Sequence, residues 1–334
     1  MMGHVYVIAE IGVNHNGNLN LAKQLVQAAA KTGADAVKFQ TFQASSLVTA
    51  TAERAPYQEI ATGSSKSQLS MLQELELTKD DYIELKDLAQ SYGVNFLSTP
   101  FDEASALFLY ELGVGAIKVG SGDLTNLPLL RLLNSFGLPV LLSTGMSNLD
   151  EVKESVECLV DVPVTLLHCT SSYPAPLCDI NLLAIRSLST QFGVPVGYSD
   201  HSNGFEVSMC AVALGARVIE KHITMDRNLP GPDHRASLEP DDFSMFVSKI
   251  RDAELFLGDG EKRCMPSETA TRIAARKSIV MSHDVPKGKV ISRADITIKR
   301  PGTGLLPRMI DEVVGRSAKR DLSADTVLQE VDLV

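Results

Sequence analysis

The feature that most constrains the fold of this chain is a regular alternation of short apolar runs, rich in β-branched residues, with longer amphipathic stretches. The short runs predict buried strands, and the stretches between them, such as 19–31 and 80–92, have the apolar spacing of helices. The runs span residues 5–10, 36–40, 95–99, 116–119, 140–143, 164–168, 196–199 and 218–222. Eight successive strand–helix units predict a parallel (β/α)8 barrel, the TIM barrel.

The length of 334 residues leaves room for one barrel of about 250 residues and a small extra domain. A helix predicted over 240–257 ends a catalytic barrel domain at 1–258, and the polar segment 259–274 is predicted to be a linker. Residues 275–334 contain β-branched runs, tight turns and one short helix, which predicts a small, mostly β domain. The connection 42–77 is long for a barrel loop, so we expect a functional loop or an extra helical hairpin there.

Charge and composition exclude several classes of protein. The net charge of −10 and the lack of a Lys/Arg cluster argue against a nucleic-acid partner. No apolar run reaches the roughly 18 residues of a membrane span, and the first residues lack the pattern of a signal peptide. The five cysteines include no C-x-x-C pair, which argues against a zinc–thiolate site and for a reducing compartment. We therefore expect a cytoplasmic protein without membrane or nucleic-acid partners.

Polar side chains end all eight predicted strands. In a TIM barrel the carboxyl ends of the strands meet at one rim, where the chemistry takes place. These residues are Glu10, Lys38, Gln40, Thr99, Lys118, Ser143, His168, Ser199, His201, Glu220 and His222. Burying so many charged groups together is unfavourable by many kcal/mol unless they bind ligands or one another. We therefore predict a charged, ligand-binding pocket at this rim.

Two histidines at adjacent strand ends, His201 and His222, are candidate metal ligands. Their imidazoles can converge on one ion, and the oxygen donors nearby suit Mn²⁺ or Mg²⁺. From spacing alone, a hydrogen-bonded acid–base or structural role is an equal alternative. His15 and His168 are poorer candidates, because either can be a packed or capping residue.

Two lysines, Lys38 and Lys118, approach the same rim from the second and fourth strands. An ammonium group suits phosphate or carboxylate, and neighbouring hydroxyls can complete the shell of donors. The hydroxyls available here are those of Thr99, Ser121, Ser143 and Ser199. The pattern predicts an anion-binding site at the mouth of the barrel.

Several longer segments resemble the sialic acid synthase family. They are IAEIGVNHNGNLNLAKQLVQAAAKTGADAVKFQTF (8–42), LSTPFD (97–102), IKVGSGDLTNLPLL (117–130), LLSTGM (141–146), LLHCTSSYPAP (166–176), VGYSDH (196–201) and IEKHITMDRNLPGPDH (219–234). KRPGTG (299–304) resembles the antifreeze-like (SAF) domain of the same family. The resemblance implies condensation of phosphoenolpyruvate with N-acetylmannosamine or a related N-acyl amino sugar, with C–O cleavage and release of phosphate.

The resemblance also implies roles for individual residues. It implies that His201 and His222 bind a divalent metal ion, Mn²⁺, with Mg²⁺ or Co²⁺ as alternatives. The residues implied to bind phosphoenolpyruvate are Lys38, Thr99, Lys118, Ser121, Ser143 and Ser199. Those implied to bind the sugar are Gln40, Tyr173, Asp123 and Asp233. Glu10 would lie nearest the reacting carbons, and either Glu10 or Asp123 would be the base that activates water. Two positions depart from the family: Asp123 stands where many members have Glu, and Ser171 where some have Asn.

In the family, the C-terminal domain of one subunit covers the barrel mouth of its partner. The resemblance therefore implies a domain-swapped homodimer in which Arg300 reaches the sugar site of the neighbouring subunit. Without the resemblance, Arg300 is more simply interpreted as a solvated turn residue.

Three other functions compete with this prediction. A legionaminic acid synthase would use 2,4-diacetamido-2,4,6-trideoxymannose, and the stretches ERAPYQ (53–58) and SQLSMLQELEL (67–77) resemble both kinds of enzyme without deciding between them. A metal-dependent hydrolase would need three or more protein ligands, and no His-x-His pair lies at the first strand. A non-catalytic sugar-binding or ice-binding protein would not need catalytic side chains around the whole rim.

Overall fold

The computed structural model describes residues 3–54, 58 and 67–334. The chain divides into two compact units, Met1–Asp259 and Gly260–Val334. Each unit is described by itself below. None of the described helices is both long and apolar enough to cross a membrane.

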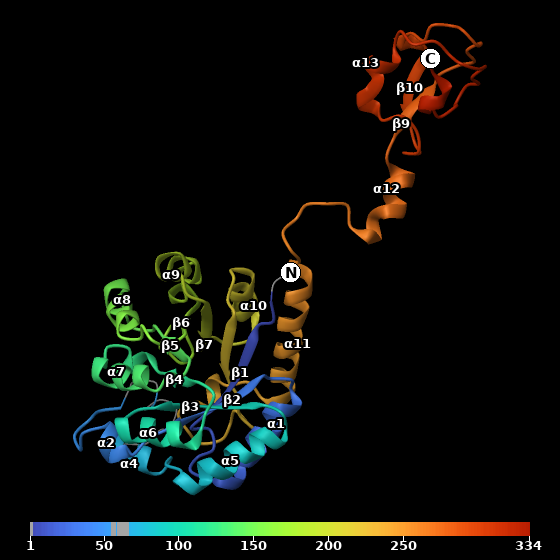
Figure 1. Cartoon of the computed structure of the whole chain (residues 1–334). Coiled ribbons are helices and arrows are strands. Elements are labelled where there is room, and N and C mark those ends of the chain that lie inside the picture. Colours follow the sequence, from blue (N-terminus) through green and yellow to red (C-terminus); the bar gives the residue numbers. More distant parts are fainter. Residues whose placement is uncertain (1–2, 55–57, 59–66) are drawn as a thin grey trace. The chain divides into compact units, whose positions relative to one another are not determined.

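The first unit is built on eight parallel strands, and helices lie on the outside of them (Figure 1). The strands are β1 (Tyr6–Gly12), β2 (Ala36–Thr41), β3 (Asn95–Pro100), β4 (Ile117–Val119), β5 (Val140–Ser143), β6 (Val164–Cys169), β7 (Val196–Asp200) and β8 (Val218–His222). Their ladder runs in the order β3-β2-β1-β8-β7-β6-β5-β4, and β4 lies beside β3 with no ladder between their described residues. The predicted TIM-type barrel is confirmed, and each predicted run lies within two residues of its strand.

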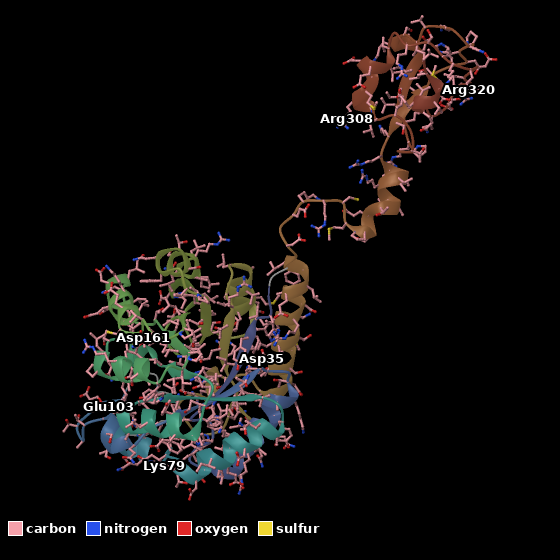
Figure 2. The ribbon with its side chains drawn as sticks, in the orientation of Figure 1. Asp35, Lys79, Glu103, Asp161, Arg308 and Arg320 are labelled. Carbon is pink, nitrogen blue, oxygen red and sulfur yellow. The ribbon has the colours of Figure 1, made fainter. Side chains whose placement is uncertain are left out.

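The helices of this unit follow the strands in alternation. They are α1 (Leu19–Lys31), α2 (Ala44–Leu47), α4 (Gln68–Gln73), α5 (Lys79–Ser91), α6 (Glu103–Leu112), α7 (Leu127–Ser135), α8 (Leu149–Glu157), α9 (Ala184–Phe192), α10 (Glu206–Ala213) and α11 (Pro240–Leu257). Local signals in the sequence set their ends. Thr78 and Asp81 form a capping box at the start of α5, and Gly93 follows that helix with a φ of +75°. Exposed charges such as Lys79, Glu103 and Asp161 cover the outer face (Figure 2).

Apolar side chains fill the lower part of the barrel interior. One residue from each of six strands forms this layer: Ile8, Ala36, Leu97, Leu141, Leu167 and Val218. A larger apolar cluster fills the space between the strands and the helices. Because the interior below is closed by apolar side chains, the polar residues further along the same strands collect at the carboxyl-terminal rim.

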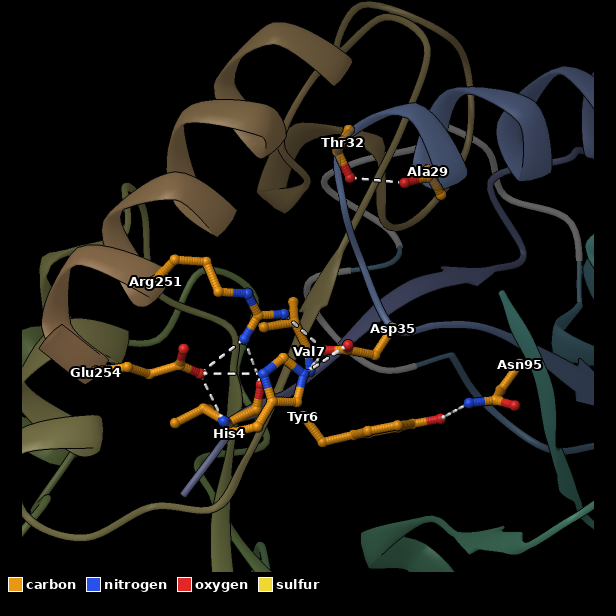
Figure 3. A network of polar contacts seen from close by, with 10 residues as sticks. His4, Tyr6, Val7, Ala29, Thr32, Asp35, Asn95, Arg251 and Glu254 are labelled. Atoms are coloured by element: carbon orange, nitrogen blue, oxygen red, sulfur yellow. Dashed lines mark hydrogen bonds and ion pairs between the residues drawn. The ribbon is translucent and has the colours of Figure 1, made fainter. Parts of the chain in front are cut away.

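The opposite, amino-terminal end of the barrel also carries charges, and these bind one another (Figure 3). Arg251 contacts Asp35 and Glu254 at 2.8 Å each, and His4 lies 2.7 Å from Asp35. Asp35 also accepts the amide of Val7 at 2.7 Å. This network stabilises the lower end of the barrel and leaves its charged groups partnered.

In its described residues, the long β2–β3 connection contains the short helices α2 and α4, which pack against each other. An apolar cluster joins this connection to the barrel through Val13, Phe42, Ala44, Met71, Leu72 and Leu75. Residues 55–57 and 59–66, which include part of the ERAPYQ stretch, lie outside the described residues. The described helices form one wall of the site discussed below.

The second unit contains α12 (Thr269–Ala275), the antiparallel strands β9 (Ser278–Met281) and β10 (Ile296–Lys299), and α13 (Ile310–Val313). Isolated β-bridges outside these strands, such as the one between Val285 and Leu322, add further antiparallel backbone pairing. The unit has its own apolar core, which includes Ile279 and Leu328. The helix α12 begins within the segment 259–274 that was predicted to be a linker, and the small domain itself is mostly β, as predicted.

Candidate active site

A cavity of about 410 Å³ opens at the carboxyl ends of the barrel strands. The structure brings together there nearly all the residues that the sequence pointed to. The predicted residues that line it are Glu10, Lys38, Gln40, Thr99, Lys118, Ser121, Ser143, Tyr173, Ser199, His201, His222 and Asp233. Met71, Leu72 and Leu75 of the β2–β3 connection add an apolar wall.

The alternation of side chains along each strand explains this selection. Successive residues of a strand point to opposite faces, so residues two apart share a face. Glu220 and His222 of β8 therefore both face the cavity, whereas Lys221 between them faces the helices. Lys38 and Gln40 of β2 share the cavity side for the same reason.

Lys38 is held between two carboxylates and a hydroxyl. Its Nζ lies 2.7 Å from Glu10 Oε2 and 3.8 Å from Glu220 Oε2, and it donates to Thr99 Oγ1 at 3.1 Å. Burial lowers the pKa of this ammonium, but the two carboxylates outweigh burial and raise the pKa above its ordinary value. Lys38 is therefore a buried positive charge at the floor of the cavity.

Among the described residues, no carboxylate is in direct contact with Lys118. Its Nζ donates to Ser143 Oγ at 2.6 Å and to the carbonyl of Val119 at 2.8 Å. Burial lowers the pKa of Lys118, and Glu220 is the largest opposing influence. The ammonium group is bound only to neutral oxygens in these contacts, so a bound anion can supply the negative charge that pairs with it.

Close packing brings several small polar groups together beside Lys118. Ser121 Oγ accepts the amide of Gly145 at 3.0 Å. A β-carbon at position 145 would lie 2.3 Å from Ser171 Oγ and 2.8 Å from Ser121 Oγ, so any larger residue would displace these two hydroxyls. The result is a ring of hydroxyls and a backbone amide around the lysines, which suits a phosphate or a carboxylate.

Glu10 is the carboxylate at the centre of the cavity. Its Oε1 accepts from Gln40 Nε2 at 3.2 Å. Burial raises the pKa of Glu10 to about 7, with Lys38 acting against the shift and Glu220 adding to it. A carboxyl group with this pKa can exchange a proton near neutral pH, as a general base must.

His201 and His222 face each other, with ring centroids 5.5 Å apart. His201 Nδ1 lies 2.9 Å from the carbonyl of Thr170, which makes it the protonated nitrogen and leaves Nε2 with its lone pair. His222 Nδ1 is buried and has no hydrogen-bond partner among the described residues, with Asp233 Oδ2 3.8 Å away. Burial and the neighbouring His201 hold the pKa of His222 well below its ordinary value, so it is a neutral imidazole.

Burial lowers the pKa of His201, but the neighbouring Cys169 thiol and the carbonyl of Thr170 outweigh burial and raise the pKa above its ordinary value. Imidazole nitrogens with a free lone pair bind divalent cations, and the neutral ring of His222 offers one. In the described part of the chain, no group of three or more His, Cys, Asp or Glu side chains is arranged to hold an ion. The two imidazoles would therefore supply only part of a coordination shell and leave positions open for substrate and water. Tyr173 packs against both rings, with centroid distances of 4.0 Å and 5.7 Å.

One predicted site residue of the barrel, Asp123, does not line the cavity. Asp123 ends the short turn Ser121–Asp123, where its carboxylate accepts from Asn126 Nδ2 at 3.0 Å. Of the two carboxylates that were candidates for the base, only Glu10 lines the cavity. Arg300 is an exposed residue of the second unit.

The other two histidines considered from the sequence have structural contacts. His15 is buried against the ring of Phe39, and its Nδ1 accepts the amide of Gly17 at 3.1 Å. His168 Nε2 lies 2.7 Å from the carbonyl of Ile180. Neither histidine lines the cavity.

Glu220 and Cys169 also line the cavity. Glu220 was predicted to lie at the rim but was given no individual role, and Cys169 was not among the predicted residues. Glu220 Oε1 accepts from Ser199 Oγ at 3.0 Å. Cys169 Sγ lies 3.8 Å from His201 Nδ1 and 3.6 Å from Ser121 Oγ. The position of Cys169 at the end of the sixth strand is a signal that could have identified it.

Comparison with known proteins adds two family matches and several relatives. Residues 25–262 match the NeuB family, and residues 276–334 match the SAF domain. The chain is 48% identical to the N,N'-diacetyllegionaminic acid synthase of Legionella pneumophila, over 97% of this chain and 93% of that protein. It is 35% identical to the N-acetylneuraminate-9-phosphate synthase of Homo sapiens, over 97% of this chain and 91% of that protein.

Among solved structures, the chain resembles a crystal structure of N-acetylneuraminic acid (sialic acid) synthetase from Leptospira borgpetersenii in complex with citrate. The TM-score is 0.72 at 36% sequence identity, and the match covers 80% of this chain and 90% of that one.

Proposed function

Because this chain belongs to the NeuB family and is a nonulosonate synthase, we propose that it condenses phosphoenolpyruvate with 2,4-diacetamido-2,4,6-trideoxymannose. The observation that carries the proposal is the cavity itself. The cavity places two buried lysines within a ring of hydroxyls and sets the imidazoles of His201 and His222 beside them. Phosphoenolpyruvate, with its phosphate and carboxylate, has the charges that such a site complements.

The identity of the sugar is inferred from the relatives. The chain is 48% identical to a synthase of N,N'-diacetyllegionaminic acid and 35% identical to a synthase of N-acetylneuraminate 9-phosphate. Both alignments cover nearly the whole chain, so the difference is not due to their extent. The higher identity favours the diacetamido sugar over N-acetylmannosamine.

In the proposed reaction, Lys38 and Lys118 bind phosphoenolpyruvate with the hydroxyls of Thr99, Ser121, Ser143 and Ser199. Gln40, Tyr173 and Asp233 bind the open-chain sugar. A divalent cation, for which we propose Mn²⁺, would be held by His201 and His222 and would supply Lewis-acid polarisation of the aldehyde oxygen.

The bonds change in three steps. C3 of phosphoenolpyruvate attacks the aldehyde carbon and forms the new C–C bond, while the π electron pair of the C=O bond moves to the aldehyde oxygen. That oxygen takes up a proton from solvent and becomes a hydroxyl, and C2 is left cationic. Water then adds to C2 while the Glu10 carboxylate accepts its proton. The C–O bond between C2 and the phosphate finally breaks, which gives the 2-keto acid and inorganic phosphate.

The pKa of Glu10, about 7, leads to a pH prediction. Below this pH the carboxyl group is protonated and cannot accept a proton, so we expect kcat/KM to rise as the pH increases through about 7. Glu10→Gln should abolish this rise and lower kcat roughly 10²–10⁴-fold, the range for loss of a general base. The measurement is phosphate release from pH 5.5 to 8.5. A Glu10→Gln enzyme with the wild-type profile would exclude Glu10 as the base.

The choice of sugar is tested by supplying each candidate in turn. Enzyme, Mn²⁺ and phosphoenolpyruvate are incubated with the diacetamido sugar or with N-acetylmannosamine, and phosphate is measured. The two sugars differ at C4, acetamido against hydroxyl, and at C6, methyl against hydroxymethyl. We expect kcat/KM to be at least roughly 10–200-fold higher with the diacetamido sugar, the range for a single small difference in a pocket. A reversed preference would assign N-acetylmannosamine as substrate, and no phosphate from either sugar would refute the proposed reaction.

We also propose that the enzyme works in the cytoplasm as a domain-swapped homodimer, in which Arg300 of each subunit reaches the sugar site of the other. All five cysteines are free, which is consistent with a reducing compartment. The match of residues 276–334 to the SAF domain supports the presence of the covering domain.

A further inference from the structure

A fully buried ion pair lies directly behind the two active-site histidines. Asp200 Oδ2 and Lys221 Nζ are 2.9 Å apart, and both side chains are 0% exposed. The two residues are direct partners in the ladder between β7 and β8. Each is followed immediately in the chain by one of the candidate metal ligands, His201 after Asp200 and His222 after Lys221.

The pair also fixes the backbone on the far side of His201. Asp200 Oδ1 accepts both the amide and the hydroxyl of Ser202, at 2.8 Å and 2.6 Å. Lys221 Nζ donates to the carbonyl of Ser202 at 2.7 Å, and Asp200 Oδ2 accepts from Ser208 Oγ of α10 at 2.6 Å. The residues before and after His201 are therefore both held by one cluster, which also contains the residue before His222.

Stability alone does not require this arrangement. Removing two charges from water is unfavourable by several kcal/mol per ion, and well-packed apolar residues often replace a buried ion pair with equal or greater stability. Such a pair does orient its surroundings, because its hydrogen bonds hold the ends of β7 and β8 in one geometry. Groups behind the direct ligands of a metal ion commonly set ligand orientation and affinity.

We propose that the Asp200–Lys221 pair positions His201 and His222 for the divalent cation. This inference rests on the proposed function, because it assumes that the two imidazoles bind the metal. Asp200 and Lys221 face away from the cavity, so they are positioning residues and do not touch the substrates.

The test replaces both charges at once, in the variant Asp200→Leu/Lys221→Met. Single replacements are unsuitable, because each leaves one buried charge without its partner and destabilises the fold. We expect the double variant to fold with a lower melting temperature than the wild type, because the buried polar groups of Ser202 and Ser208 lose their partners. We expect its Mn²⁺ affinity, measured by electron paramagnetic resonance of the free ion, to fall roughly 10–100-fold.

A matched control is Arg251→Met, which removes the cation of the ion-pair network at the amino-terminal end of the barrel. Its Mn²⁺ affinity should equal that of the wild type. A folded double variant with wild-type Mn²⁺ affinity would overturn the inference and leave the proposed function intact. A wild-type enzyme that binds no Mn²⁺ would refute both the metal assignment and the inference.

Discussion

Replacement of His222 with alanine is expected to reduce turnover at least roughly 10³-fold, because it removes one of only two imidazoles at the proposed metal site. The side chain is 5% exposed, and its Nδ1 has no hydrogen-bond partner among the described residues. Its loss therefore breaks no hydrogen bond at that atom. The defect should consist of lost Mn²⁺ binding, with a melting temperature close to that of the wild type.

Two comparisons separate this effect from a general disturbance of the rim. His168→Gln alters another histidine of a barrel strand, whose Nε2 contacts the carbonyl of Ile180 outside the cavity. It should keep both Mn²⁺ binding and turnover. Wild-type enzyme treated with a chelator should lose activity and regain it with Mn²⁺, whereas His222→Ala should not. Undiminished activity of His222→Ala with stoichiometric metal would contradict the metal assignment.

Replacement of Lys118 with methionine is expected to raise the KM for phosphoenolpyruvate roughly 10²–10³-fold, because a buried charge that binds an anion contributes several kcal/mol. Methionine keeps most of the side-chain volume while removing the ammonium group. The ammonium pairs with no carboxylate at contact distance and donates to Ser143 and to a carbonyl. Because burial of this charge is unfavourable, the variant should be as stable as the wild type or more stable.

The matched control for Lys118 is Lys86→Met on α5, whose Nζ donates to the carbonyl of Leu112 away from the cavity. It should leave the KM for both substrates unchanged. Direct titration of phosphoenolpyruvate by calorimetry would show whether the Lys118→Met defect lies in binding. Wild-type affinity for phosphoenolpyruvate in Lys118→Met would exclude Lys118 from the anion site.

The barrel was predictable from the sequence because its determinants are local. The predicted limits of the strands Val140–Ser143 and Val218–His222 agree with the observed limits. Short apolar runs rich in β-branched residues that alternate with helical stretches are typical of buried parallel strands. The helices α1 and α11 were likewise predicted with the observed limits. The β2–β3 connection was predicted to be a functional loop or an extra helical hairpin, and its described part contains the helices α2 and α4. The limits of these short helices were not predictable, because they depend on packing against the barrel.

The site was predictable to a lesser degree. The sequence indicated which polar residues end the strands, and the shared fold of all TIM barrels indicated that these ends meet. It did not show that Asp123 turns toward Asn126, because that depends on the geometry of the turn at Ser121–Asp123. Nor did it show that Glu220 lies between Ser199 and Lys38, since these contacts join residues from three strands.

The sequence by itself therefore determined the barrel, the order of its strands along the chain, and the identity of the charged groups at its rim. Only the tertiary structure decided how those charges pair. Lys38 lies between Glu10 and Glu220, Lys118 is left without a carboxylate in contact, and Lys221 turns away to Asp200. The physical reason is that the periodicity of a strand is local, whereas the partner of a buried charge depends on distances of a few Å between strands far apart in the sequence.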